Sequence, residues 1–186
     1  QAAINPQIIK LYASGEHTQM HTMVLYAAKY NFFLLFTLAL PVLLYTENLL
    51  GLWLVEVPPY AVAFLQLTIA ASLIDSFSAP LMTSAQATGH IRLYQSVVGG
   101  VLLLNLPLSF LFLHQGYSPE VVLLTSVGLS VIALVARLLI ISPLINLPKK
   151  TFVSRVLARA SIVALTTVLC AKTVVPEATG SILILM

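Results

Sequence analysis

The chain has 186 residues, of which 59% are hydrophobic and 8% are charged. A soluble domain has about a quarter of its residues charged, so this composition excludes an ordinary soluble globular protein. The net charge of +3 could suit nucleic-acid binding, but the bases are dispersed over separate short segments, so we predict no nucleic-acid partner.

Uncharged runs divide the chain into lengths that suit a membrane. Residues 30–46 and 93–119 carry no formal charge at all. A hydrocarbon layer about 30 Å thick takes about 20 apolar helical residues to cross, and the runs match that length. The sequence therefore predicts an all-α, polytopic transmembrane helix bundle. Its five spans are expected at about residues 30–50, 60–88, 93–113, 120–142 and 156–175.

Residues 1–29 are predicted to form a cytoplasmic elbow at the level of the lipid headgroups. Asn5-Pro6 is typical of a helix N-cap followed by proline at the first helical position. Gly15 is expected to end this short helix, and a second helix from about Thr18 then leads directly into the first span.

Prolines and glycines mark the expected limits of the spans. Pro41 predicts a kink in the first span, and Pro58-Pro59 stop any helix that arrives before the second. Gly89 suits the C-cap of the second span, and Pro143 closes the fourth.

A last apolar run follows Pro176-Glu177. We predict an outer loop and the truncated start of a sixth helix over residues 176–186. Because six apolar residues cannot cross a bilayer, we interpret the chain as a piece of a larger protein.

The charges between the spans are sorted by sign. If the spans cross in succession, one side receives only Lys172 among the bases, together with most of the acids. Cytoplasmic loops carry the excess of Lys and Arg, so the opposite, basic side is predicted to be cytoplasmic. That side receives Lys10, Lys29, Arg92, Lys149, Lys150, Arg155 and Arg159.

Polar residues form a stripe along the second span. At 100° per residue they fall within one arc of the helix, and Asp75 lies among them. Small and hydroxylated residues line helix contacts in lipid, so packing is one interpretation; a hydrated cavity is the other. The candidate cavity-lining residues are Thr68, Ser72, Asp75, Ser76, Thr83 and Gln86.

Arg137 lies in the fourth span, in a stripe with Ser126 and Ser130. Helical rise places Asp75 and Arg137 at a similar depth, roughly 22–26 Å from the outer surface. The two could form an ion pair if their helices are neighbours. Alternatively, Arg137 extends its long side chain to the inner interface, and this snorkelling is the interpretation that we favour.

The sequence shows no arrangement typical of an enzyme. It has no nucleophile-elbow motif, no phosphate-binding loop and no metal-ligand cluster. We therefore predict no catalytic residues, no metal and no cofactor.

Several segments resemble bacterial polysaccharide export proteins of the multidrug/oligosaccharidyl-lipid/polysaccharide exporter superfamily, above all lipopolysaccharide O-antigen flippases. They cover nearly the whole chain. The segments are Asn5-Pro6-Gln7-Ile8-Ile9-Lys10, Tyr12-Ala13-Ser14-Gly15-Glu16, Ala85-Gln86-Ala87-Thr88-Gly89-His90-Ile91, Tyr94-Gln95, Gly99-Gly100 and Leu106-Pro107-Leu108-Ser109.

The resemblance implies a carrier of 12–14 helices, built as two six-helix bundles that face each other across a central cavity. The five spans would be the ninth to the thirteenth, in a second-half fragment that lacks the N-terminal helices. Such carriers sit in the bacterial inner membrane and flip undecaprenyl-diphosphate-linked oligosaccharides by alternating access. By this resemblance Arg137 or Arg92 would meet the diphosphate, and membrane lipids surround the carrier.

Three other functions stay open at this point. The first is an ion-coupled multidrug exporter of the same superfamily, in which Asp75 would bind a proton or sodium. The second is a membrane glycan polymerase or acyltransferase, which would need a large outer loop with catalytic residues. The third is a purely structural membrane subunit, against which the intramembrane Asp75 argues.

Overall fold

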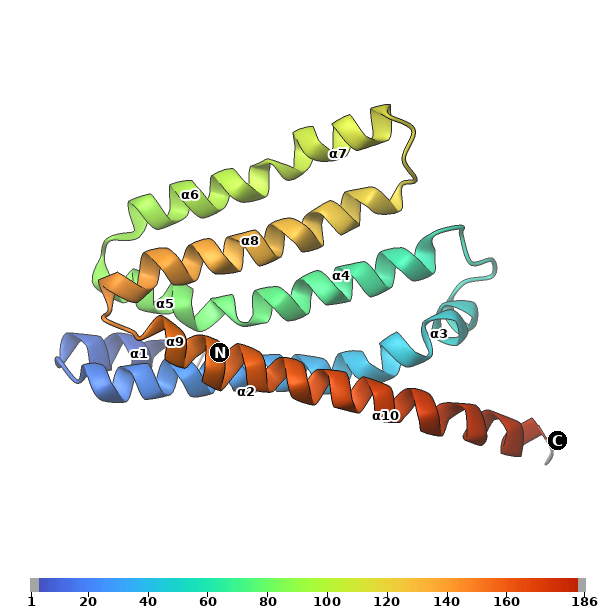
Figure 1. The fold of residues 1–186 in the computed structure, drawn as a ribbon, viewed down its shortest axis with the longest axis horizontal. Helices are drawn as coiled ribbons and strands as arrows, with labels where there is room; N and C mark the ends of the chain where they lie inside the picture. Colours follow the sequence, from blue (N-terminus) through green and yellow to red (C-terminus); the bar gives the residue numbers. More distant parts are fainter. Residues whose placement is uncertain (1–3, 184–186) are drawn as a thin grey trace.

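The protein is described by a computed structural model that covers residues 4–183, with side chains for residues 4–171. The described residues are helical and contain no strand (Figure 1). The helices are α1 Ile4–Ala13, α2 His17–Leu44, α3 Thr46–Trp53, α4 Ala61–Ser76, α5 Ser78–Thr88, α6 Ile91–Leu103, α7 Asn105–His114, α8 Glu120–Leu144, α9 Lys149–Phe152 and α10 Ala158–Leu183. A π-helical segment, η1, joins the last two over Val153–Leu157.

Five helical segments in the described part of the chain are long and apolar enough to cross a membrane. They follow the order of the five predicted spans, and they agree with a polytopic, all-helical membrane protein. The segments are His17–Leu44, Ala61–Thr88, Ile91–His114, Glu120–Leu144 and Lys149–Ala171.

The first span differs from its predicted limits. As expected, Gly15 ends α1 with a φ of +75°, and α2 runs without interruption from the elbow into the span. At the far end, α2 stops at Leu44, soon after Pro41, and α3 forms a separate helix. Pro41 has no N–H to donate, so the helix is weakened where the sequence predicts a kink.

Two further prolines interrupt the second and third spans, which the sequence analysis treats as continuous. A proline removes one helical hydrogen bond, and its ring presses on the carbonyl four residues earlier. Pro80 acts in this way on the carbonyl of Ser76, and α4 ends at that residue. Pro107 acts similarly on Leu103, the last residue of α6. Both spans are therefore jointed rather than straight.

The other expected boundaries hold with small shifts. Gly89 caps α5 with a φ of +73°. The residue after Pro58-Pro59, Tyr60, has a φ of +70° and precedes α4. In the fourth span α8 continues through Pro143 and ends one residue later, at Leu144.

The C-terminal segment departs from the prediction of an outer loop and a new helix over residues 176–186. The structure continues α10 through Pro176 to Leu183 as one helix. The remaining residues of that predicted segment, 184–186, lie outside the described residues.

The helix α8 occupies the middle of the bundle. It packs against α4, α5, α6 and α7, and α2 packs against α4, α5 and α10 (Figure 1). Aromatic side chains join the two groups: Phe77 stacks on Phe32 with ring centroids 4.6 Å apart. The outer surfaces carry exposed apolar side chains such as Leu38 and Leu106, as expected for helices that face lipid.

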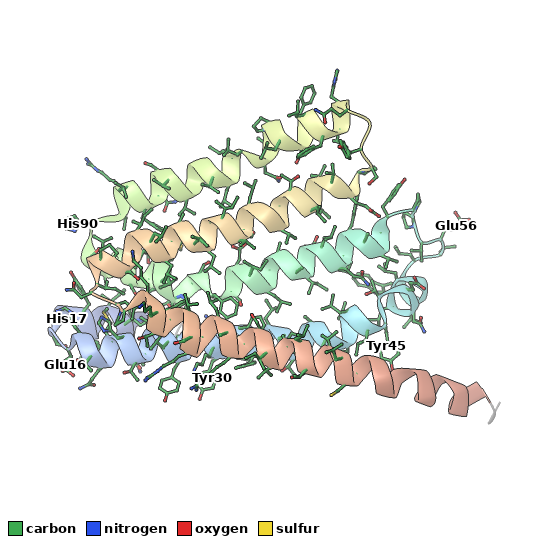
Figure 2. The ribbon with its side chains drawn as sticks, viewed as in Figure 1. Glu16, His17, Tyr30, Tyr45, Glu56 and His90 are labelled. Carbon is green, nitrogen blue, oxygen red and sulfur yellow. The ribbon has the colours of Figure 1, made fainter. Side chains whose placement is uncertain are left out.

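One end of the bundle holds α1 with Lys10 and α9 with Lys149 and Lys150, and we call it the basic end (Figure 1). The position of these bases predicts the orientation of the bundle in the membrane. Glu16, His17 and His90 lie at one end, whereas Glu56 lies at the other (Figure 2). We expect His90→Cys, in a Cys170→Ser background, to be protected from an impermeant thiol reagent in intact cells. Glu56→Cys should be labelled under the same conditions, because the basic end is the one expected to face the cytoplasm.

Permeabilised cells provide the control, since both cysteines should then react. Labelling of His90→Cys from outside an intact cell would show that the orientation is the reverse.

Candidate functional site

The polar centre of the bundle is an ion pair between α4 and α8. The Nη1 atom of Arg137 donates hydrogen bonds to Asp75 Oδ1 at 3.1 Å and to Ser78 Oγ at 2.7 Å. The hydroxyl of Ser130 lies 3.3 Å from Asp75 Oδ2 and donates to it. Four side chains from three helices therefore form one connected network.

Helical spacing explains how these side chains meet. Ser130 and Arg137 are seven residues apart on α8, which is close to two turns, so both project from one face. Asp75 lies just before the joint between α4 and α5, and Ser78 is the first residue after it. The buried Phe77 between them packs on α2 and holds the joint in place.

The two charges differ in their exposure. The side chain of Arg137 is 11% exposed, whereas that of Asp75 is 46% exposed. The Nε atom of Arg137 is buried without a hydrogen-bond partner among the described atoms. The cation is thus held inside the bundle, and it presents the carboxylate at the surface of α4.

Snorkelling of Arg137, the interpretation favoured from the sequence, is wrong. The side chain does not reach for the interface, because Asp75 and Ser78 already bind its guanidinium within the bundle. A buried guanidinium needs such acceptors, and the depth match with Asp75 supplies them. The structure therefore shows the ion pair that the sequence analysis gives as its alternative.

The polar stripe of the second span divides at the joint. On α4, the hydroxyls of Thr68 and Ser72 are exposed and donate to carbonyls of their own helix, at 2.7 Å and 2.9 Å. On α5, Thr83 is buried and donates to Asn5 Oδ1 of α1 at 3.1 Å. The α5 half is thus a helix contact, and the α4 half around Asp75 is the open surface.

Ser76, Gln86 and Arg92 lie outside the network, as Thr68, Ser72 and Thr83 do. Ser76 donates to the carbonyl of Leu73 at 2.6 Å within its own helix, and Gln86 is exposed near the end of α5. Arg92 is exposed in the first turn of α6 and makes no polar contact with the pair in the described structure. Ser78 was not predicted from the sequence, although in a continuous helix a residue three positions after Asp75 would share its face.

No group of three or more metal-ligating side chains occurs among the described residues. The comparisons with known proteins found no matching family model, no matching curated protein and no matching solved structure. The class that the geometry itself defines is a multi-pass helical membrane protein with a charged network inside its spans.

Proposed function

We propose that this chain is part of a bacterial inner-membrane transporter that flips undecaprenyl-diphosphate-linked oligosaccharides for surface polysaccharide or lipopolysaccharide synthesis. The observation that supports it best is the half-exposed carboxylate of Asp75, held by Arg137 in the middle of a span. Intramembrane charges are costly and mark transport pathways more often than packing surfaces. The resemblance of the sequence to O-antigen flippases supplies the substrate class.

The chemistry of such a substrate suits the open face of α4. A glycan cannot cross hydrocarbon unaided, because each of its hydroxyls would lose its hydrogen bonds to water. Asp75, Thr68 and Ser72 offer a carboxylate and two hydroxyls on one side of the helix. A carboxylate accepts strong hydrogen bonds from sugar hydroxyls, and the prenyl tail can stay in the lipid.

The network changes the role expected for Arg137. Its Nη1 atom is engaged by Asp75 and Ser78, so in this proposal Arg137 orients the carboxylate rather than binding the diphosphate. Arg92, exposed in the first turn of α6, stays a candidate for the diphosphate.

The ion-coupled exporter is less well supported by this geometry. The guanidinium of Arg137 lies 3.1 Å from Asp75 Oδ1, and a neighbouring cation repels a second one at this carboxylate. A polymerase or acyltransferase is also poorly supported, because the connectors opposite the basic end, such as residues 54–60 and 115–119, are short.

Asp75→Asn in the whole protein tests the proposal. The variant keeps the shape of the side chain but loses the charge, and one charge-assisted hydrogen bond is worth about 1.5–3 kcal/mol. Export of surface polysaccharide should therefore fall about 10- to 100-fold, with unchanged abundance of the protein in the membrane. Export is measured as the surface glycan per cell, and abundance by immunoblot of membranes.

Glu56→Gln is the matched control, because it removes one negative charge from an exposed connector. It should leave export unchanged. Normal export by Asp75→Asn at wild-type abundance would reduce the pair to a structural contact and reject the proposed function.

A further inference from the structure

A small basic hollow lies between α2 and the segment formed by η1 and α10. It has a volume of about 210 Å³, and it is lined by Lys29, Arg155 and Arg159, with Thr22, Leu25 and Tyr26 on its α2 side. No acidic residue lines it. Within the described side chains, none of its three bases forms an ion pair, since the one salt bridge found there joins Asp75 to Arg137.

The local backbone places these bases together. Arg155 lies in the π-helical turn η1, and Arg159 follows in the first turn of α10. Single π-helical turns are rare in proteins, and those that occur are often found at functional sites. On the other wall, the Lys29 ammonium lies 5.6 Å from the centroid of the Tyr26 ring, a cation–π contact that holds it at the rim.

An apolar groove continues from the hollow. It has a volume of about 680 Å³, lies between α1 and α2, and is lined by apolar side chains such as Leu11 and Met23. Thr22 and Tyr26 line both the groove and the hollow, so the two depressions share a wall. The basic hollow and the apolar groove are therefore neighbours on α2.

The depth of this surface suits a lipid headgroup. Tyr26 stacks on Tyr30 with ring centroids 6.3 Å apart, and both rings are more than half exposed. Tyr30 projects outward from α2 near its crossing with α10 (Figure 2). Exposed tyrosines beside basic residues are typical of the membrane–water interface.

We propose that the hollow and the groove together bind an anionic phospholipid of the leaflet at the basic end. Its phosphate occupies the hollow between Lys29, Arg155 and Arg159, and one acyl chain lies at the Tyr30 end of the groove and continues toward the centre of the membrane. Three bases without an acidic partner complement a phosphate, and an apolar groove would be of no use to a free anion. The site is separate from the Asp75–Arg137 network and does not depend on the transport proposal.

The test measures binding of phosphatidylglycerol to the purified whole protein in neutral detergent by native mass spectrometry. Each base near a phosphate is worth about 1 kcal/mol, or about fivefold in affinity. Arg155→Gln/Arg159→Gln should therefore weaken binding about 25-fold, and Lys29→Gln about fivefold. Arg155 and Arg159 are exposed and Lys29 is half-buried, so the arginine variant should retain its thermal stability without lipid.

Lys149→Gln/Lys150→Gln is the matched control, since it removes the same charge from the same end outside the hollow. The affinity of this lysine variant for phosphatidylglycerol should stay at the wild-type value. In a separate competition experiment, inorganic phosphate should not displace the lipid from the wild-type protein. Equal weakening by both double variants would show general charge attraction and overturn the proposal. The proposal would also be overturned if the arginine double variant bound phosphatidylglycerol with wild-type affinity. It would be overturned as well if inorganic phosphate displaced the lipid at a concentration similar to that of the lipid.

Discussion

Asp75→Ala is expected to lower the free energy of unfolding by about 1–3 kcal/mol. Removing one partner of a buried pair costs about 3–5 kcal/mol, and the half-exposed carboxylate reduces that figure. The loss leaves the buried guanidinium of Arg137 with Ser78 alone, while its Nε atom already has no partner. Reversible denaturation of the purified protein in mild detergent measures the change.

The double variant Asp75→Ala/Arg137→Met separates the pair from its parts. Because it removes the buried charge together with its partner, it should be more stable than Asp75→Ala alone. Ser126→Ala, on the same helix but outside the network, should change stability by less than about 0.5 kcal/mol. Strictly additive losses in the double variant would contradict an energetic coupling between the two charges.

Phe77→Ala is expected to destabilise the protein by about 2–4 kcal/mol. Truncation of a buried phenylalanine costs about 3–5 kcal/mol in water-soluble cores, where the transfer from water contributes. In lipid that contribution is smaller, so the lost packing against Phe32 dominates. Stacked aromatic pairs add about 0.5–1.5 kcal/mol, which this variant also forfeits.

Phe110→Ala removes the same atoms from a side chain that is 71% exposed on α7, and it should change the midpoint of thermal unfolding little. Because Phe77 holds the joint beside Asp75, its truncation should also lower polysaccharide export more than Phe110→Ala does. Equal stability of the two variants would mean that the joint does not depend on this stack.

The spans could be predicted because their signal is local. Long runs without charge and terminators such as Gly89 give the number and order of the spans directly. The joints after Ser76 and Leu103 also have a local cause in the sequence, namely Pro80 and Pro107. However, a proline in a membrane helix can kink the helix without ending it. Only the packing around each proline decides between the two outcomes.

The site could be predicted only in part because it depends on how the helices are rotated against one another. The similar depth of Asp75 and Arg137 follows from counting residues along each span. Their contact requires α4 and α8 to be neighbours with these faces turned inward, and no periodicity within a single helix specifies that. The same limit hides the basic hollow, since Lys29 is far from Arg155 and Arg159 in the sequence.

The ion pair also sets an order of events during synthesis. Asp75 and Arg137 are 62 residues apart, and ribosomes add about 5–20 residues per second. The carboxylate therefore leaves the ribosome about 3–12 s before the side chain that neutralises it. During that interval the second span, whose mean hydropathy of 1.5 is the lowest of the five, carries a carboxylate without its cation. We expect the arrival of the fourth span to favour its insertion.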